Sequence, residues 1–328
     1  MYRSNEETKH KTYSLPIVLR MEQNGLGMTV QTLPALMYLK NKRNNDVYLK
    51  IYKKHREILK YFFDEQYLYY WNKKTSKGDQ ETDTIFQDKK SCFEYSMAMT
   101  NVPPYGCHAV DYYLHLACGL IPQDNSIKNY PSFPIDQVDI SKFNLPKKFI
   151  TLGPAYTKSS CIIKPDVINN IIDYCIKKSY EVVLIGDKYE MIVDNINVGP
   201  KVDETINVEK CINLIDKTSI GESIAVIGKS NLYVGPEGGL MHFAGLTEVP
   251  MIISHTTMHP DTRVPYRHNK LGWEVYNVTA DVECRYCITN FLQTRFPINI
   301  MQKCLYDDFK CLDEITFDKF KVHLDNIL

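Results

Sequence analysis

The sequence predicts an α/β protein made of two units, each with a parallel β-sheet and helices on its faces. The chain has 328 residues, which is long for one compact domain and comfortable for two. Strand-like and helix-like stretches alternate twice along it, near the amino terminus and again from residue 148 onward. A connection with four prolines and little periodicity, residues 121–146, separates the two series. We therefore expect one domain over residues 1–146 and a second over 147–328.

The first series opens with a strand, a glycine-containing loop, a helix and a second strand. These stretches are residues 15–20, 21–27, 29–42 and 46–52. This order of elements is typical of a βαβ unit, and an amphipathic helix over 110–119 follows later. Gly25 and Gly27 have no third glycine at the offset that the dinucleotide fingerprint requires, so the loop by itself is a weak signal.

The second series is more regular and predicts a doubly wound parallel sheet. An almost wholly apolar strand such as 181–185 is typical of a sheet buried on both faces. Ligands of such sheets bind at the carboxyl ends of the strands. The expected strands are 149–152, 181–185, 210–215, 232–235 and 251–253, and the expected helices are 165–178, 219–229, 239–247 and 316–327.

The stretch Leu232–Gly245 is the strongest local signal for a binding site. It predicts a short strand, a turn with the adjacent glycines Gly238 and Gly239, and a helix that begins near the second of them. Glycines allow close approach of a ligand to the backbone, and unpaired amides at a helix start attract a phosphate. The alternative is an ordinary turn between a strand and a helix. His242, one turn into the helix, could reach a ligand or be a satisfied interior histidine.

Composition narrows the class of protein. Lys and Arg together number 39, as do Asp and Glu, which argues against a molecule whose whole field attracts nucleic acid. The first eleven residues are polar and charged rather than a secretory signal, and no apolar run approaches the length of a membrane span. Ten cysteines without a signal peptide indicate a reducing compartment. We therefore expect a cytoplasmic protein.

The motif Val234-Gly-Pro-Glu-Gly-Gly-Leu-Met-His-Phe-Ala-Gly-Leu-Thr-Glu-Val-Pro250 resembles the nucleotide-sugar signature of glycosyltransferase family 9. This family comprises the ADP-heptose:lipopolysaccharide heptosyltransferases and includes the autotransporter heptosyltransferases. Further stretches similar to the family occur in the same order along the chain. They are Leu26-Gly-Met28 with Thr32-Leu-Pro-Ala-Leu36, then His108–Leu114, Leu152–Lys158 and Val183–Glu190.

The resemblance implies the GT-B architecture, in which two Rossmann-like domains face a central cleft. The amino-terminal domain would hold the acceptor and the carboxyl-terminal domain the nucleotide-diphosphate sugar. The implied reaction is sugar transfer with inversion and no obligatory metal, and whether a hexosyl, heptosyl or pentosyl group is transferred stays open. Amides at a helix start and a lysine would stabilise the diphosphate leaving group. The donor-binding residues would be Gly27, Lys158, Glu190, Glu237, Gly238, Gly239, Leu240 and His242.

Two positions depart from the family pattern. Met28 stands where the family has the aspartate thought to be the general base, and a thioether cannot accept a proton. Glu22 is our first substitute as catalytic base and Asp111 our second; the alternative is a nucleotide-sugar-binding protein without catalysis. Glu237-Gly238 replaces the usual Asp-Thr or Asp-Ser, so the sugar need not be heptose. Under the GT-B hypothesis, Met28 and Gly238 should face the same cleft.

Two further features concern metals and partners. Cys284, Cys287, Cys304 and Cys311 supply four soft ligands, enough for a structural metal, with zinc favoured over iron; the alternative is four reduced thiols. A run of basic residues in the first unit is either ordinary solvated surface or a patch for a phosphorylated acceptor. A glycan, a protein or a nucleic acid stays open as acceptor, as does a homo-oligomer. The basic run consists of Lys40, Lys42, Arg43, Lys50, Lys53, Lys54 and Arg56.

Overall fold

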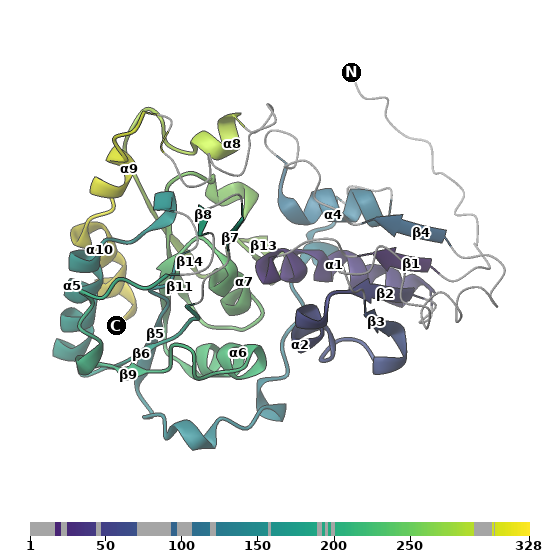
Figure 1. Ribbon diagram of the computed structural model, residues 1–328, viewed down its shortest axis with the longest axis horizontal. Coiled ribbons are helices and arrows are strands. Elements are labelled where there is room, and N and C mark those ends of the chain that lie inside the picture. Colours follow the sequence, from purple (N-terminus) through teal and green to yellow (C-terminus); the bar gives the residue numbers. More distant parts are fainter. Residues whose placement is uncertain are drawn as a thin grey trace.

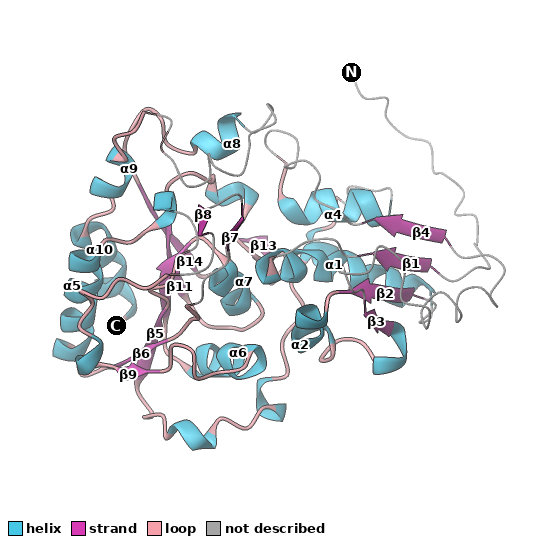
Figure 2. Cartoon of the chain, viewed as in Figure 1, coloured by secondary structure: helices cyan, strands magenta, loops and turns pink. Residues whose placement is uncertain are grey.

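Two parallel β-sheets, joined by a long connection, form the framework of the computed structural model (Figures 1 and 2). The amino-terminal sheet lies at the right of Figure 1 and the carboxyl-terminal sheet at the left. The structure describes residues 17–20, 25–43, 47–70, 93–96, 107–118, 123–156, 159–188, 192–193, 196–197, 201–291, 304 and 306–328.

The amino-terminal sheet has the strand order β3-β2-β1-β4, and every pair in it is parallel. Helix α1 connects β1 to β2 and packs against α4. Leu19 of β1 and Leu49 of β2 lie opposite each other, and both are fully buried. The bounds of these elements are β1 Ile17–Arg20, α1 Leu26–Arg43, β2 Val47–Ile51, α2 Arg56–Leu59, β3 Leu68–Tyr70, β4 Phe93–Ser96 and α4 Ala109–Cys118.

The carboxyl-terminal sheet has the order β14-β11-β10-β5-β6-β9, also with all pairs parallel. From β5 the chain adds strands in one direction, and from β10 in the other. The direction of winding therefore reverses between β5 and β10, where doubly wound sheets bind ligands at their carboxyl edge. The strands are β5 Phe149–Leu152, β6 Glu181–Leu184, β9 Ile212–Asn213, β10 Tyr233–Pro236, β11 Met251–His255 and β14 Val275–Thr279.

Helices cover both faces of this sheet because its strands are apolar on both sides. In β5, Phe149 belongs to one buried cluster and Ile150 with Leu152 to the other. Helices α5 and α10 pack over the second cluster, whereas α6 and α7 pack over the first. The start of α6 is fixed by a capping box between Ser219 and Glu222. These helices are α5 Pro165–Lys177, α6 Ile220–Lys229, α7 Gly239–Gly245 and α10 Phe317–Ile327.

The two sheets share one apolar core. The buried cluster that contains Leu19 and Leu33 of the amino-terminal unit continues to Phe149, Tyr233 and Met241 of the carboxyl-terminal unit. Helices α1 and α7 pack directly against each other, as the centre of Figure 1 shows. The connection binds the carboxyl-terminal unit through its backbone. Its amides at Tyr130 and Phe133 donate to the carbonyls of Tyr266 (2.9 Å) and Leu246 (2.8 Å). The domain boundary at 146/147 stays a prediction.

The prediction of a doubly wound α/β fold is confirmed, and most elements begin and end within three residues of the expected bounds. Strands β3, β4 and β14 were not predicted, since all three lie in stretches rich in tyrosine or polar residues rather than in apolar runs. The remaining short elements are β7 Ile192–Val193, β8 Ile196–Asn197, β12 Tyr266–Arg267, β13 Lys270–Leu271, α8 Cys287–Phe291 and α9 Lys310–Asp313.

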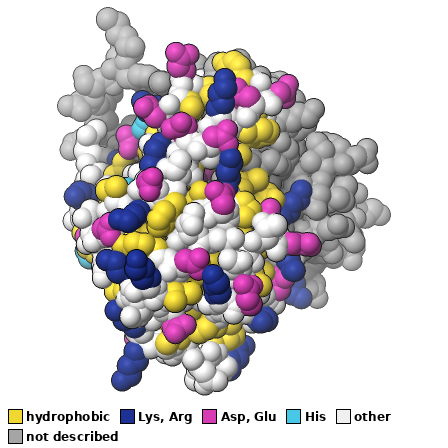
Figure 3. Space-filling view, turned by 90° about the vertical axis from the view of Figure 1, so that its left-hand side faces the viewer, with side chains coloured by type: hydrophobic (Ala, Val, Ile, Leu, Met, Phe, Trp, Pro, Cys, Tyr) yellow, Lys and Arg dark blue, Asp and Glu magenta, His cyan; other side chains and the backbone are white. Residues whose placement is uncertain are grey.

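The surface agrees with the neutral overall charge. On the face in Figure 3, which is the left-hand side of Figure 1, basic and acidic side chains are interspersed and neither sign forms a continuous field. Ion pairs such as Lys210–Asp173 (2.7 Å) and Lys321–Asp325 (2.6 Å) account for part of this mixture. Among the helices that the structure describes, none combines the length and the apolar character needed to cross a membrane.

Candidate functional site

Three loops meet at the carboxyl edge of the larger sheet, where its winding reverses. They follow β5, β6 and β10, and the Leu240 side chain joins them. A Cβ placed on Gly153 would lie 2.9 Å from Leu240 Cδ1, and one on Gly186 would lie 3.7 Å from the same atom. Gly186 has φ +144°, a conformation that favours glycine. The sequence therefore predicted correctly that these loops form one edge.

Tyr233 gives a structural reason for two of the glycines. A Cβ on Gly153 would lie 2.7 Å from the Tyr233 hydroxyl, and one on Gly235 would collide with the same hydroxyl. The Tyr233 ring is fully buried, and burial raises the pKa of its phenol. Gly153 and Gly235 thus accommodate an aromatic side chain at the strand ends. Their lack of a side chain is no argument for a phosphate in this part of the edge.

The turn between β10 and α7 is different, because it is open. A Cβ on Gly238 would meet no atom within 4 Å, and its φ of 169° is extended backbone that any residue adopts. Gly239 is exposed at the first turn of α7. The Glu237 amide donates to the Ser254 carbonyl (3.0 Å), which ties this turn to the end of β11. Free space and exposed backbone lie together here, as a ligand at this turn would require.

The first turns of α1 and α7 meet across the junction of the two units. A Cβ on Gly27 would lie 2.8 Å from His242 Cδ2 and 3.1 Å from Gly239 Cα. The start of α1 therefore lies directly beside the start of α7. Met28 and Gly238, the two positions that depart from the family pattern, adjoin this contact in the chain.

His242 is buried at this junction, and both of its ring nitrogens have protein partners. Nδ1 lies 3.0 Å from the hydroxyl of Tyr130 in the connection, and Nε2 lies 3.0 Å from Nε2 of Gln31 in α1. An amide nitrogen only donates, so the ring accepts from Gln31 and donates from Nδ1 to Tyr130. Burial lowers the pKa of His242 to about 3, partly opposed by nearby Glu237. His242 thus holds three segments of the chain together as a neutral side chain.

A second histidine, His255, ends β11 beside the same carboxylate. Burial lowers its pKa to about 4, while nearby Glu237 acts in the opposite direction. Glu237 is half-buried and lies close enough to influence both His242 and His255. Its position at the edge agrees with the expectation that it contacts a donor, and the donor-binding roles themselves stay predictions.

Asp111, our second candidate base, is already engaged. Its carboxylate pairs with the ammonium group of Lys128 at 2.9 Å, and both side chains are largely buried. The pair joins α4 to the connection, and the ammonium group also lies 5.4 Å from the centre of the Tyr266 ring. The carboxylate of Asp111 is therefore part of a structural ion pair. Glu22, Lys158 and Glu190 lie outside the described residues.

The carboxyl-terminal cysteines gather in one region without forming a metal site. Burial raises the pKa of Cys311 to about 12, and the thiols of Cys284, Cys287, Cys304 and Cys161 add to this effect. Within the residues that the structure describes, however, no three side chains of His, Cys, Asp and Glu are arranged to hold a metal ion. The described cysteines therefore do not fit the expected four-ligand centre, and residues 292–303 between them lie outside the description.

The basic run is divided among separate local contacts. Lys40 donates to the Phe62 carbonyl at 2.9 Å, and Arg56 pairs with Glu65 at 2.6 Å. Lys42, Lys53 and Lys54 are exposed, and desolvation lowers the pKa of Lys54. Side chains with such different surroundings do not form one surface, so the structure gives no support to a nucleic-acid patch at this run.

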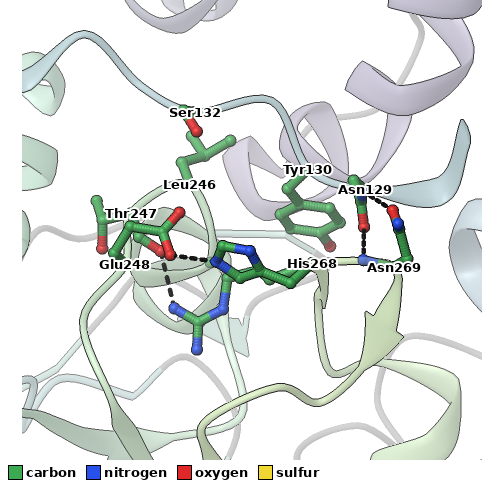
Figure 4. A pocket seen from close by; sticks show the side chains of 10 residues that line it. Asn129, Tyr130, Ser132, Leu246, Thr247, Glu248, His268 and Asn269 are labelled. Atoms are coloured by element: carbon green, nitrogen blue, oxygen red, sulfur yellow. Dashed lines mark hydrogen bonds and ion pairs between the residues drawn. The ribbon is translucent and has the colours of Figure 1, made fainter. Parts of the chain in front are cut away.

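A pocket of about 310 Å³ opens at the opposite end of α7 (Figure 4). Figure 4 shows Glu248 bonded to His268 and Asn129 bonded to Asn269 on its walls. Tyr130 also lines it, which places the pocket on the far side of this ring from the His242 contact. None of the residues predicted for the site lines this pocket.

Sequence analysis missed four residues that the structure brings to the junction. These are Gln31, Tyr130, His108 and Arg263. His108 Nε2 donates to the Val264 carbonyl at 2.8 Å, and its Nδ1 accepts from the Val110 amide, so it joins α4 to the carboxyl-terminal unit. His108 lies in a stretch that resembles the family, which was the one available signal.

Comparisons with known proteins agree with this geometry. The model of glycosyltransferase family 9 (heptosyltransferase) matches residues 96–285, more than half of the chain. A search of curated protein sequences found no match.

Solved structures share the fold at low sequence identity. The iron-containing dodecameric glycosyltransferase TibC from enterotoxigenic E. coli H10407 superimposes with a TM-score of 0.71 at 11% identity, over 95% of this chain and 76% of that one. A family 9 glycosyltransferase from Veillonella parvula DSM 2008 gives 0.66 at 15% identity, over 95% and 97%. E. coli ADP-heptose lps heptosyltransferase II gives 0.66 at 15%, over 95% and 98%. The chain therefore belongs to glycosyltransferase family 9 and is a glycosyltransferase with the GT-B architecture.

Proposed function

We propose that this enzyme transfers a sugar, with inversion, from a nucleotide-diphosphate sugar to a hydroxyl group of an acceptor. The observation that carries the proposal is the contact of Gly27 with Gly239 and His242, since it brings the start of α1 beside the start of α7. Two parallel sheets thus present their carboxyl edges to one place. A donor at one edge and an acceptor at the other would have their reacting atoms close together there.

The donor side is the turn at Glu237–Gly239. Exposed backbone amides at the start of α7 would bond the diphosphate and stabilise the charge that develops on it as the sugar leaves. Lys158 would add a cation and Glu190 would bond the ribose, as the family resemblance suggests. TibC has been solved with ADP-D-β-D-heptose, which makes ADP-heptose the first donor to test here. The free space at Gly238 would also accommodate a different sugar.

The acceptor side is the loop before α1. Glu22 is the proposed base, because Met28 cannot accept a proton and Asp111 is paired with Lys128. The acceptor itself is proposed to be a glycan. Protein and nucleic acid are the other outcomes of an acceptor screen, and the divided contacts of the basic run do not favour nucleic acid.

A direct test measures donor binding and donor turnover separately. Thermal unfolding with ADP, ADP-heptose and other nucleotide sugars identifies the donor, since a ligand that binds only the folded state raises its stability by about 2.7 kcal/mol at 100 times Kd. Release of ADP with and without a screen of acceptors then measures turnover, and NMR of the product gives its anomeric configuration.

Glu22→Gln and Glu204→Gln form a matched pair for the proposed base. Glu204 is an exposed residue of the carboxyl-terminal unit. Loss of turnover in Glu22→Gln alone, with ADP binding unchanged, supports Glu22 as base. Full turnover in that variant would disprove the assignment. Donor binding without turnover on any acceptor would instead support a binding protein.

A structural metal on Cys284, Cys287, Cys304 and Cys311 stays a separate prediction. The iron in TibC supports this prediction. The lack of a three-ligand arrangement among the described residues argues against it. Elemental analysis of purified protein decides it: about one zinc or iron per chain supports the prediction, and less than a tenth contradicts it.

A further inference from the structure

Arg263 occupies the junction between the two units. It directly follows a short 3-10 helix, Pro260–Thr262, and its backbone amide donates to the Pro260 carbonyl at 2.8 Å. The next residue, Val264, accepts the hydrogen bond from His108 of the amino-terminal unit. The backbone at Arg263 is therefore fixed on both sides. Its charge reaches His108, Tyr130 and His242, since it influences the pKa of all three side chains.

Two of the side chains near this guanidinium carry no charge. His108 and His242 are neutral, because burial lowers the pKa of each to about 3. Across the described part of the chain, no carboxylate lies within ion-pair distance of Arg263, although the side chain is half-buried. Its Nε is buried and has no acceptor. A half-buried guanidinium without a counter-charge is free to bind an anion.

Other arginines of the same structure have protein partners on their terminal guanidinium nitrogens. Arg267, four residues later, donates to the carbonyls of Thr247, Val249 and Trp273. Arg56 pairs with Glu65, and Arg285 pairs with Asp281. A structural role for Arg263 would require partners of this kind.

A buried acceptor without a partner lies at the same junction. Gln31 is 1% exposed, and its amide nitrogen bonds His242, but its Oε1 has no hydrogen-bond donor. The junction thus offers a cation together with an unused acceptor, both near His242. An anion satisfies the first and a hydroxyl group satisfies the second. A phosphorylated sugar carries both groups.

We propose that Arg263 binds a phosphate group of the ligand that occupies the junction, and that Gln31 Oε1 accepts a hydrogen bond from a hydroxyl group of the same ligand. This inference rests on the proposed function, because it specifies what the same site recognises. The phosphate belongs either to the donor diphosphate or to a phosphorylated acceptor. Arg263 is then a binding residue whose partner arrives with the substrate.

The test measures binding to the full-length chain by calorimetry, with Arg263→Gln, Arg263→Lys and the control Arg285→Gln. ADP probes the donor source. Inorganic phosphate added to the ADP-saturated protein probes the acceptor source. If Arg263 binds the donor diphosphate, Arg263→Gln weakens the binding of ADP by about 10- to 100-fold, as expected for the loss of charge-assisted hydrogen bonds. The binding of adenosine, which has no phosphate, stays unchanged. If Arg263 binds the phosphate of an acceptor, the variant keeps its affinity for ADP and loses the binding of inorganic phosphate.

Wild-type affinity of Arg263→Gln for both probes would overturn the proposal. Arg263→Lys keeps the charge but loses the two-pronged geometry, so we expect a loss of about 3- to 10-fold. If Arg263→Gln fails to fold, Arg263→Lys tests the proposal instead. Affinities of Arg263→Lys for ADP and for inorganic phosphate that both lie within twofold of wild type then overturn the proposal. A wild-type chain that binds no ADP contradicts the proposed donor instead, and pyrophosphate alone then serves as the probe for Arg263.

Discussion

Gly27 and Gly239 lie in contact across the junction of the two sheets. A Cβ on Gly27 would come within 3.1 Å of Gly239 Cα, and one on Gly239 within 3.9 Å of the Gly27 amide nitrogen. The first turns of α1 and α7 therefore approach each other backbone to backbone. Any side chain at position 27 would separate the two helix starts that the proposed reaction needs side by side.

Substitution of Gly27 by alanine tests this contact. The new methyl group would lie 2.8 Å from the His242 ring, so we expect a loss of stability of about 1–3 kcal/mol and a strong loss of activity. Gly25→Ala is the matched control, because its Cβ would lie at an ordinary 3.4 Å from Met28 Sδ. Urea denaturation of both variants measures the difference. Equal free energies of unfolding for the two variants would show that α1 and α7 can move apart without a loss of stability.

Gly238→Ser restores the hydroxyl that the family pattern has at this position. The site is empty within 4 Å and the backbone is extended, so we expect a stability within about 0.5 kcal/mol of wild type. The substitution should change only the donor preference, measured as a changed ranking of nucleotide sugars in a thermal-shift screen. A large loss of stability would mean that the turn cannot hold a side chain.

Tyr130→Phe removes the hydroxyl that lies 3.0 Å from His242 Nδ1. The buried ring nitrogen then has no partner, which costs about 1–3 kcal/mol of unfolding free energy. Tyr306→Phe is the control, since Tyr306 is 61% exposed. Chemical denaturation compares the two variants, and an unchanged midpoint for Tyr130→Phe would indicate that the hydrogen bond contributes nothing.

Acid should destabilise the fold through its buried histidines. Burial lowers the pKa of His108 and His242 to about 3 and of His255 to about 4. The unfolded chain protonates these rings near pH 6.5. Their contribution to stability is therefore complete above that pH and is lost as the pH falls toward the folded values. Each ring adds a slope of about 1.4 kcal/mol per pH unit.

Denaturation between pH 7 and pH 4.5 measures this slope. His108→Gln should reduce the slope by about one proton, and His115→Gln, at an exposed position of α4, serves as the control variant. The same slope in all three proteins would contradict a neutral His108 in the folded state.

The Asp111–Lys128 pair should behave as a structural unit. Asp111→Asn leaves the largely buried ammonium group without its counter-charge, so we expect a loss of about 3 kcal/mol. Replacing both residues, Asp111→Leu with Lys128→Met, should recover most of this stability. Turnover that persists in the double variant excludes Asp111 as the base, and turnover lost despite recovered stability would restore it as a candidate.

The sequence by itself determined the doubly wound sheet and the place of its ligand edge. Apolar runs at 149–152, 181–184 and 251–255 form strands because their burial on both faces depends only on local composition. The glycine pair at 238–239 marked the turn after β10 for the same local reason. Strands β3 and β4 carry no such pattern, and their pairing with β2 and β1 decides their structure.

Only the tertiary structure decided what faces that edge. His242 meets Gln31 and Tyr130, which are 211 and 112 residues away along the chain, and Arg263 comes to the same place from a third segment. The sequence likewise suggested Asp111 as a base, and packing placed Lys128 against it. Local periodicity specifies which residues become strands and helices. Contacts between distant segments depend on how those elements pack, and that packing turns an edge of a sheet into a site.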